Sequence, residues 1–290
     1  MAIIPALQLL VFNIKKVRNF IMKESALTTK RLSIVPTAKC TLNCKLCSNH
    51  MPIFKNPPSA SYEDMISDID VLFKLFDNIE WLQFVGGEVF IHKDMANVYN
   101  YCQKYKSQFS KLIIETNATV ALREEEIDIF VKYGENIKIM ISDYGVLSTK
   151  KEQYIETFEK NNIPYIIKKY FGDNQHFGGW IDNTALKDYG ESDEEVERLV
   201  KECAQVRLEN MHCFKGKLHR CCNSLFMTEL GVIEPNDDDF VNLHDSTLSF
   251  EEKRRIIKTF YKHSGKSCRF CAWKNSSIAE RFSAAKQIER

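Results

Sequence analysis

The chain has 290 residues, of which 44% are apolar, enough for one large domain and a small one. Its 40 basic and 39 acidic residues leave a net charge of +1, which favours a small or neutral substrate over nucleic acid. Ten cysteines without a secretory signal are typical of thiolate ligands in a cytoplasmic protein rather than of disulfides.

Residues 1–30 are predicted to form an amphipathic N-terminal helix. Leu7, Leu10 and Ile14 begin an apolar series at spacings of three and four residues. The apolar stretch over residues 2–14 is shorter than the roughly 18 residues that cross a bilayer. The helix either packs on the main domain or rests on a membrane surface through residues 2–21, and the sequence leaves both open.

Short β-branched segments then alternate with helical patterns. The expected strands cover residues 31–36, 81–85, 111–116, 137–142 and 165–169. The expected helices cover residues 62–76, 94–105, 123–133 and 150–161. This alternation of strands and helices predicts an α/β fold with a parallel sheet, in which ligands bind at the carboxyl ends of the strands.

A domain boundary is expected near residue 190, so that residues 31–190 form the core and residues 191–290 a smaller α+β domain. Its expected elements are a helix at 196–206, a hairpin of 211–214 with 218–222, and a helix at 254–261. The hairpin turns at Gly216, and Ser249 with Glu252 forms a capping-box pattern before the last helix. Residues 223–248 carry no clear pattern.

Three cysteines follow the first strand directly, in a C-x3-C-x2-C pattern formed by Cys40, Cys44 and Cys47. Three thiolates on one loop can hold three corners of a [4Fe-4S] cluster and leave the fourth iron open for a ligand. Zinc is the competing assignment, since catalytic zinc sites also keep one position free.

The pattern and its place after a strand resemble the radical S-adenosylmethionine (SAM) superfamily. The resemblance implies a partial (βα)6 TIM-like barrel and an open iron that binds SAM. Reductive cleavage of SAM then yields a 5′-deoxyadenosyl radical that abstracts hydrogen from the substrate. The residue before the third cysteine is Leu46, where the family usually has an aromatic side chain, so the adenine is expected to pack more loosely or elsewhere.

Gly86, Gly87 and Glu88 follow the second expected strand and match the GGE motif of the same family. The glycines allow a close backbone approach, and Glu88 offers an acceptor for the SAM ammonium. By family position, further SAM contacts are expected from four residues at the ends of the next two strands: Thr116, Asn117, Ser142 and Asp143. Ordinary turn chemistry explains Asn117 and Asp143 equally well.

Four more cysteines, Cys203, Cys221, Cys268 and Cys271, surround Gly216 in the order cysteine, Gly-x4-Cys, helix and CxxC. This order resembles the twitch domain, the short relative of the SPASM domain. The resemblance implies an auxiliary [4Fe-4S] cluster closed by four thiolates, which serves electron transfer. A structural zinc site is the alternative.

The sequence does not assign one role to each of the three remaining cysteines. Cys102 lies in an expected helix and reads as a small buried residue. Cys213 and Cys222 flank the hairpin, where each is an alternative ligand, a packed thiol or a hydrogen-atom donor to a substrate radical.

Three residues are candidate bases by position: His176, Tyr144 and Arg220, although a surface histidine is the simpler interpretation of His176. Trp180 offers a face on which a sugar could stack, but a core position is the commoner one for this residue type.

The whole-chain arrangement resembles the aminocyclitol (2-deoxy-scyllo-inosamine) dehydrogenase group of butirosin-type biosynthesis. This implies oxidation of a secondary alcohol of a sugar or aminocyclitol, with the auxiliary cluster accepting an electron and a flavodoxin or ferredoxin as donor. The alternatives are a sugar epimerase, a peptide-modifying maturase and a non-catalytic zinc protein. The maturase is disfavoured because no peptide-recognition domain is seen before residue 30.

Overall fold

The computed structural model describes residues 26–272 and 279–289, so the helix predicted at residues 2–21 lies outside the described residues. Eight strands form one sheet in the order β5-β4-β3-β2-β1-β6-β7-β8. Their bounds are β1 Thr28–Ile34, β2 Asn78–Phe84, β3 Phe109–Thr116, β4 Ile137–Asp143, β5 Tyr165–Lys169, β6 Asn210–Phe214, β7 Lys217–His219 and β8 Phe240–Asn242. Strands β1 to β6 pair in parallel, which confirms the predicted α/β fold class.

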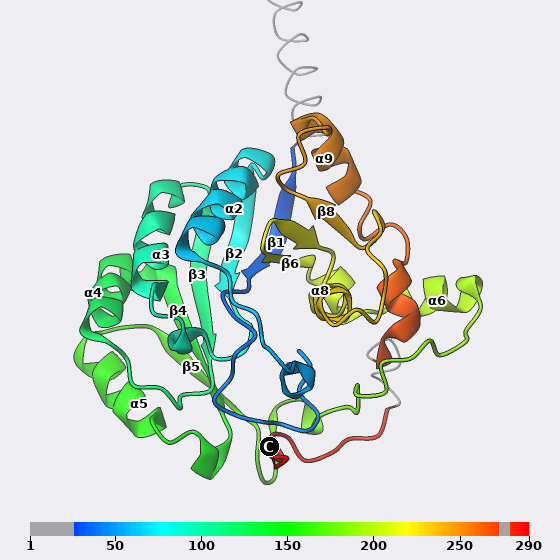
Figure 1. Ribbon diagram of the computed structural model, residues 1–290. Helices are drawn as coiled ribbons and strands as arrows, with labels where there is room; N and C mark the ends of the chain where they lie inside the picture. Colours follow the sequence, from blue (N-terminus) through cyan, green and yellow to red (C-terminus); the bar gives the residue numbers. More distant parts are fainter. Residues whose placement is uncertain (1–25, 273–278, 290) are drawn as a thin grey trace, which may run out of the picture.

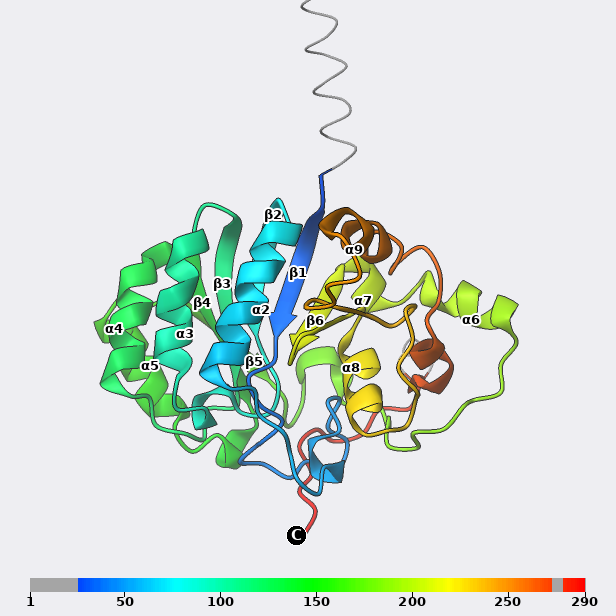
Figure 2. The same cartoon turned by 45° about the horizontal axis from the view of Figure 1, so that its top comes forward.

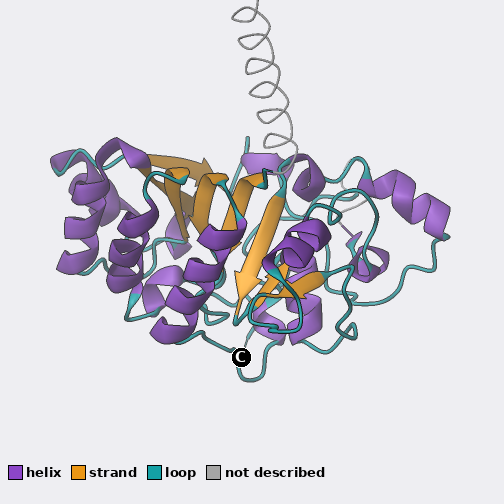
Figure 3. Cartoon of the chain, turned by 90° about the horizontal axis from the view of Figure 1, so that it is seen from above, coloured by secondary structure: helices purple, strands orange, loops and turns teal. Residues whose placement is uncertain are grey.

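Four helices follow the first four strands and cover one face of the sheet (Figure 1). They are α2 (Tyr62–Leu75), α3 (Met95–Cys102), α4 (Glu124–Tyr133) and α5 (Lys151–Lys160). The strand residues under them are fully buried aliphatic side chains such as Leu82, Leu112 and Ile139. Figure 3 shows the strands in the middle of the molecule and helices at its periphery.

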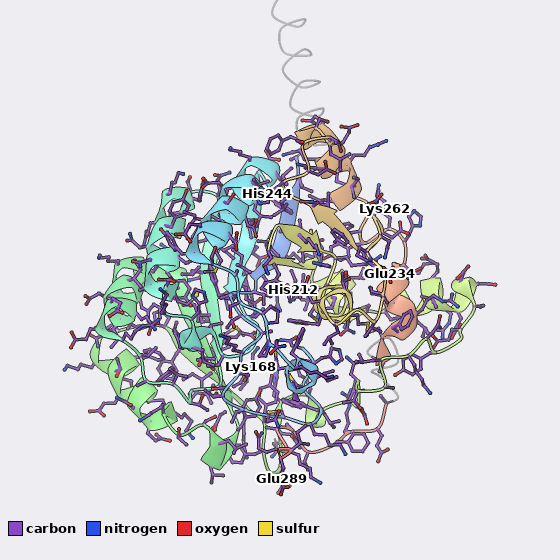
Figure 4. The ribbon with its side chains drawn as sticks, viewed as in Figure 1. Lys168, His212, Glu234, His244, Lys262 and Glu289 are labelled. Atoms are coloured by element: carbon purple, nitrogen blue, oxygen red, sulfur yellow. The ribbon has the colours of Figure 1, made fainter. Side chains whose placement is uncertain are left out.

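The opposite face of the parallel strands is polar. Gln83 Nε2 donates to Glu115 Oε1 at 2.8 Å, and Lys168 Nζ lies 3.4 Å from the same oxygen. Ser33 stands between Gln83 and His212 in the register of β2, β1 and β6. Figure 4 shows Lys168 and His212 toward the centre of the molecule. Parallel sheets are usually apolar on both faces, so this face is unlike a packed core.

The C-terminal part contains α6 (Asp193–Val200), α7 (Ala204–Arg207), α8 (Cys222–Glu229), α9 (Phe250–Ile257) and a 3-10 helix, Lys266–Phe270. The single helix predicted at 196–206 is wrong, because Cys203 is extended and begins α7. The predicted hairpin turns at Gly216, whose φ is 80°, but its second strand ends at His219 because Cys221 begins α8. The capping box of Ser249 and Glu252 is confirmed.

The sheet continues across residue 190. Strand β6 pairs in parallel with β1 along four residues, and in Figure 2 β1 lies between the β2–β5 half and the β6 half. Asp68 of α2 adds a second link, because its carboxylate accepts hydrogen bonds from Gly216 N at 2.9 Å and contacts His244 Nε2 at 2.6 Å. The predicted two-domain division stays a prediction.

No helix in the described ranges is long and apolar enough to cross a membrane.

Candidate active site

The first thiol group, Cys40, Cys44 and Cys47, lies on the loop after β1, at the carboxyl edge of the parallel strands. Burial raises the pKa of Cys40 to about 11 and that of Cys44 to about 12, and the neighbouring thiols add to both shifts. The thiols are therefore protonated at neutral pH when no metal is bound, and Cys47 N donates a hydrogen bond to Cys44 O at 3.1 Å within the loop. Metal binding would release these protons.

The Gly-Gly-Glu segment is hydrogen-bonded directly to the cysteine loop. Gly87 N donates to Thr37 O and Glu88 N donates to Lys39 O, both at 2.9 Å. A Cβ at Gly87 would lie 1.9 Å from Lys39 O. The glycine is therefore required by the approach of the cysteine loop, whereas the sequence had suggested an approach to SAM.

Glu88 is fully buried, and its carboxylate forms hydrogen bonds with residues at the end of β3. It accepts hydrogen bonds from Thr116 Oγ1 at 2.8 Å, Asn117 N at 2.8 Å and Phe90 N at 3.2 Å. Burial nevertheless raises the pKa of Glu88 to about 7. Glu88 thus positions Thr116 and Asn117, and its expected contact with the SAM ammonium stays a prediction.

Asn117 in turn contacts the first thiol group. Its side-chain Nδ2 lies 3.6 Å from Cys40 Sγ and donates to Thr41 Oγ1 at 3.2 Å. An N–H group facing a thiol sulfur is the kind of partner that tunes a cluster ligand. Glu88, Asn117 and Cys40 therefore form a connected series from the second strand to the cysteine loop.

The raised pKa of Glu88 predicts a pH-dependent stability. Between about pH 4.5 and pH 7 the folded protein keeps a proton that the unfolded chain releases, so the free energy of unfolding should fall as the pH rises through this window. The fall attributable to Glu88 is about 3 kcal/mol, since one pKa unit corresponds to about 1.4 kcal/mol. Urea unfolding across this window should show a flatter profile for Glu88→Gln, and an unchanged one for the exposed Glu156→Gln.

The end of β4 contributes less to the site. Asp143 is buried, accepts from Gly145 N at 2.9 Å and pairs with Lys151 Nζ at 3.1 Å, which is the turn chemistry that the sequence left open. The backbone carbonyl of Ser142 accepts a hydrogen bond from Ser148. Both side chains remain predicted SAM contacts.

An aromatic cluster stands beside the cysteine loop. Tyr144 packs on Tyr170 and Trp180, with ring centroids 5.4 and 5.7 Å away, and His176 packs on Tyr170 at 5.4 Å. Burial raises the pKa of Tyr144, and Tyr170, Cys44 and Cys47 add to the shift. Burial and Lys168 lower the pKa of His176, so its imidazole is neutral and suited to accept a proton.

The second thiol group, Cys203, Cys221, Cys268 and Cys271, borders α7, α8 and the 3-10 helix Lys266–Phe270. Burial raises the pKa of Cys221, and Cys268 and Cys271 add to the shift. Cys203 in turn raises the pKa of Cys268. Hydrogen-bond donors face this group, because Asn223 Nδ2 donates to Cys271 Sγ at 2.6 Å and Ser224 N donates to Cys221 Sγ at 3.4 Å.

The two remaining candidate thiols lie in different places. Burial raises the pKa of Cys222 to about 12, and Cys222 is the first residue of α8, directly after Cys221. Cys213 is fully buried, and its Sγ lies 3.7 Å from Asp68 Oδ2. Cys102 is fully buried in α3, as its interpretation as a core residue implied.

Arg220 lies at the second thiol group. Its guanidinium is buried and donates to the carbonyls of Asp238 at 3.3 Å and His263 at 2.6 Å. Burial raises the pKa of Cys268, and the charge of Arg220 opposes this rise. This placement differs from that expected of a base beside SAM. A fixed cation at this point would instead stabilise negative charge on the thiolates.

A buried polar network between the two thiol groups escaped the sequence analysis. His50 Nε2 lies 3.1 Å from Asn183 Nδ2, which is 3.3 Å from Asn223 Oδ1. Burial lowers the pKa of His50 to about 4, so it is neutral. Its position three residues after Cys47 was a signal in the sequence, whereas nothing marked Asn183 or Asn223.

The donor sets fit iron–sulfur clusters, since both consist of thiols with N–H partners. Within the described ranges, no three His, Cys, Asp or Glu side chains converge as ligands of a single metal ion.

No protein-family model matches the sequence, and no curated protein matches it. Among solved structures, the chain is similar to BtrN in complex with AdoMet and 2-DOIA, with a TM-score of 0.52 and 14% identity over 90% of this chain and 98% of that one. It also matches anSMEcpe with bound AdoMet and a Cp18Cys peptide (TM-score 0.49, 12% identity, 84% and 86% coverage). SuiB of Streptococcus suis bound to S-adenosylmethionine matches with a TM-score of 0.49 and 13% identity over 89% and 73% of the two chains. The likeness to BtrN is one of fold, an α/β arrangement around a mainly parallel sheet.

Proposed function

We propose that the chain is a radical SAM enzyme with a catalytic [4Fe-4S] cluster on Cys40, Cys44 and Cys47. The observation that carries the proposal is the first thiol group itself. Three thiols lie on one loop at the carboxyl edge of the parallel strands, Cys44 buried and the other two partly buried, and the Gly-Gly-Glu segment is hydrogen-bonded to that loop. When bound, the cluster and SAM supply a 5′-deoxyadenosyl radical that takes a hydrogen atom from the substrate.

Residues of the protein are proposed to support both clusters. Glu88 and Asn117 hold the cysteine loop and present an N–H group to Cys40. Tyr144, packed on Tyr170 and Trp180, is the proposed aromatic contact for the adenine, since Leu46 provides none. The second thiol group would hold an auxiliary [4Fe-4S] cluster, with Arg220 and Asn223 beside its thiolates.

The proposed reaction is oxidation of a secondary alcohol in a sugar or aminocyclitol. The polar face of the sheet, with Gln83, Glu115 and Lys168, suits a substrate rich in hydroxyl or amino groups. The fold shared with BtrN, whose structure contains 2-DOIA, supports the same substrate class. His176 is the proposed base for the hydroxyl proton, the auxiliary cluster the electron acceptor, and a flavodoxin or ferredoxin the reductant.

Anaerobic reconstitution tests the proposal. We expect about eight irons and eight sulfides per chain, and formation of 5′-deoxyadenosine when SAM and dithionite are added, followed by chromatography. Protein that binds zinc and forms no 5′-deoxyadenosine would instead be a metal-stabilised binding protein.

A sugar epimerase is the second candidate, and the position of Cys222 directly after Cys221 of the second thiol group favours it. In that case Cys222 would give a hydrogen atom to the substrate radical, and one electron from the flavodoxin or ferredoxin with a proton from solvent would restore the thiol, so the product has the redox state of the substrate. Cys222→Ala should then stop product formation but leave SAM cleavage, whereas Cys213, buried beside Asp68, should tolerate substitution in this respect. A ketone product would exclude the epimerase.

A further inference from the structure

The C-terminal residues 279–289 return to the cysteine loop. Figures 1 and 2 both show this segment running past the loop that follows β1. Its first anchor is a two-way backbone pairing of Phe282 with Trp180, at 2.8 Å in each direction. Gly179 permits this approach, because a Cβ there would lie 2.7 Å from Phe282 O.

The second anchor lies on the cysteine loop itself. Lys45 N donates to Lys286 O at 2.8 Å, and Ile288 N donates to Asn43 O at 3.0 Å. Asn43 Nδ2 donates back to Ile288 O at 2.7 Å. Two backbone bonds and one side-chain bond thus fix the C-terminal segment along the residues on either side of Cys44.

Gln287 occupies the centre of this anchor and uses both ends of its amide. Its Oε1 accepts from Asn43 N at 2.6 Å, and its Nε2 lies 3.2 Å from Cys44 Sγ. The same Nε2 donates to Ala285 O at 2.6 Å, which fixes the orientation of the amide. Cys44 is 7% exposed under this cover.

We propose that Gln287 is a positioning residue for the cluster on the first thiol group: it orients Cys44 and donates a hydrogen bond to its sulfur. The inference rests on the proposed function. A hydrogen bond to a cluster sulfur offsets the negative charge that reduction adds, so it raises the reduction potential of the cluster. Gln287 thereby sets how readily a donor can reduce the cluster.

Gln287→Leu is the test, because leucine keeps a similar volume and removes both hydrogen-bonding ends. In the reconstituted protein, a redox titration followed by electron paramagnetic resonance should give a more negative midpoint potential for the first cluster and an unchanged one for the second. Gln287→Glu should shift it further, because it replaces the donor with a negative charge. Glu289→Gln, an exposed change nearby, is the matched control and should leave both potentials unchanged.

A second measurement needs no metal. In the apoprotein, hydrogen exchange of the peptide that contains Asn43 should be about fivefold faster in Gln287→Leu, since Asn43 N loses its acceptor. Alkylation of Cys44 should also be faster. Unchanged exchange would overturn the contact, and changed exchange with an unchanged potential would overturn the tuning. Wild-type protein without a first cluster would refute the proposed function while leaving the contact intact.

Discussion

Cys44→Ala is expected to abolish SAM cleavage, whereas Cys268→Ala should remove about half of the iron and leave cleavage intact. The reason is that the first thiol group has three members, so loss of one leaves too few ligands for a cluster with a single open iron. The second thiol group lies on other elements, around α8 and the Lys266–Phe270 turn. Iron content and 5′-deoxyadenosine formation, measured on reconstituted protein, check both parts.

Cys102→Ala is the matched control for this pair. It removes a thiol that is fully buried in α3, so its iron content should equal that of the wild type even if stability drops. Equal loss of SAM cleavage in Cys44→Ala and Cys268→Ala would contradict the assignment of the catalytic cluster to the first thiol group and the auxiliary cluster to the second.

Gly87→Ala is expected to destabilise the fold by more than about 4 kcal/mol and to empty the first thiol group of iron. The added Cβ would lie 1.9 Å from Lys39 O and 2.5 Å from Lys39 C, so the clash is with backbone that cannot rotate away. The cysteine loop must therefore move. Thermal unfolding of the apoprotein and iron content after reconstitution measure the two effects separately.

Gly190→Ala provides the comparison. Its φ is 73°, but no atom lies within 4 Å of an added Cβ, so the expected cost is only the backbone strain of about 1–2 kcal/mol. If both substitutions had the same small effect, the contact between the Gly-Gly-Glu segment and the cysteine loop could not be as close as described.

The βα units could be predicted because each depends on local pattern. Helix α2 begins at Tyr62 as expected, since Ser61 and Asp64 form a capping box that is readable in the sequence. Strand β5 has the predicted bounds, but β1 to β3 each begin two or three residues earlier than expected. Strand ends depend on pairing with neighbouring strands, which a periodicity does not contain.

The C-terminal part was less predictable because its structure depends on distant contacts. The pairing of β6 with β1 joins residues about 180 positions apart, and no local signal encodes it. The break between α6 and α7 places Cys203 in an extended conformation, which a helical pattern through Val196 and Val206 conceals.

Within the candidate site, the sequence predicted the cysteines that could bind metal, but not the residues that hydrogen-bond to them. Cysteine spacing is a local property, so both thiol groups could be named in advance. Glu88 is an example: no motif indicated that its carboxylate, expected to meet the SAM ammonium, would also hold Thr116 and Asn117. Gln287 lies 243 residues from Cys44 and belongs to no motif, so its contact with Cys44 is seen only in the folded structure.

The pairing of β6 with β1 has a consequence for how this protein can be divided. A fragment that ended near residue 190 would lose β6 and leave β1 as an open edge strand, with unpaired amides along residues 31–34. Open edges recruit strands from other molecules, which leads to domain swapping or aggregation. The C-terminal half of the chain, by pairing β6 with β1, thus protects the N-terminal half from self-association.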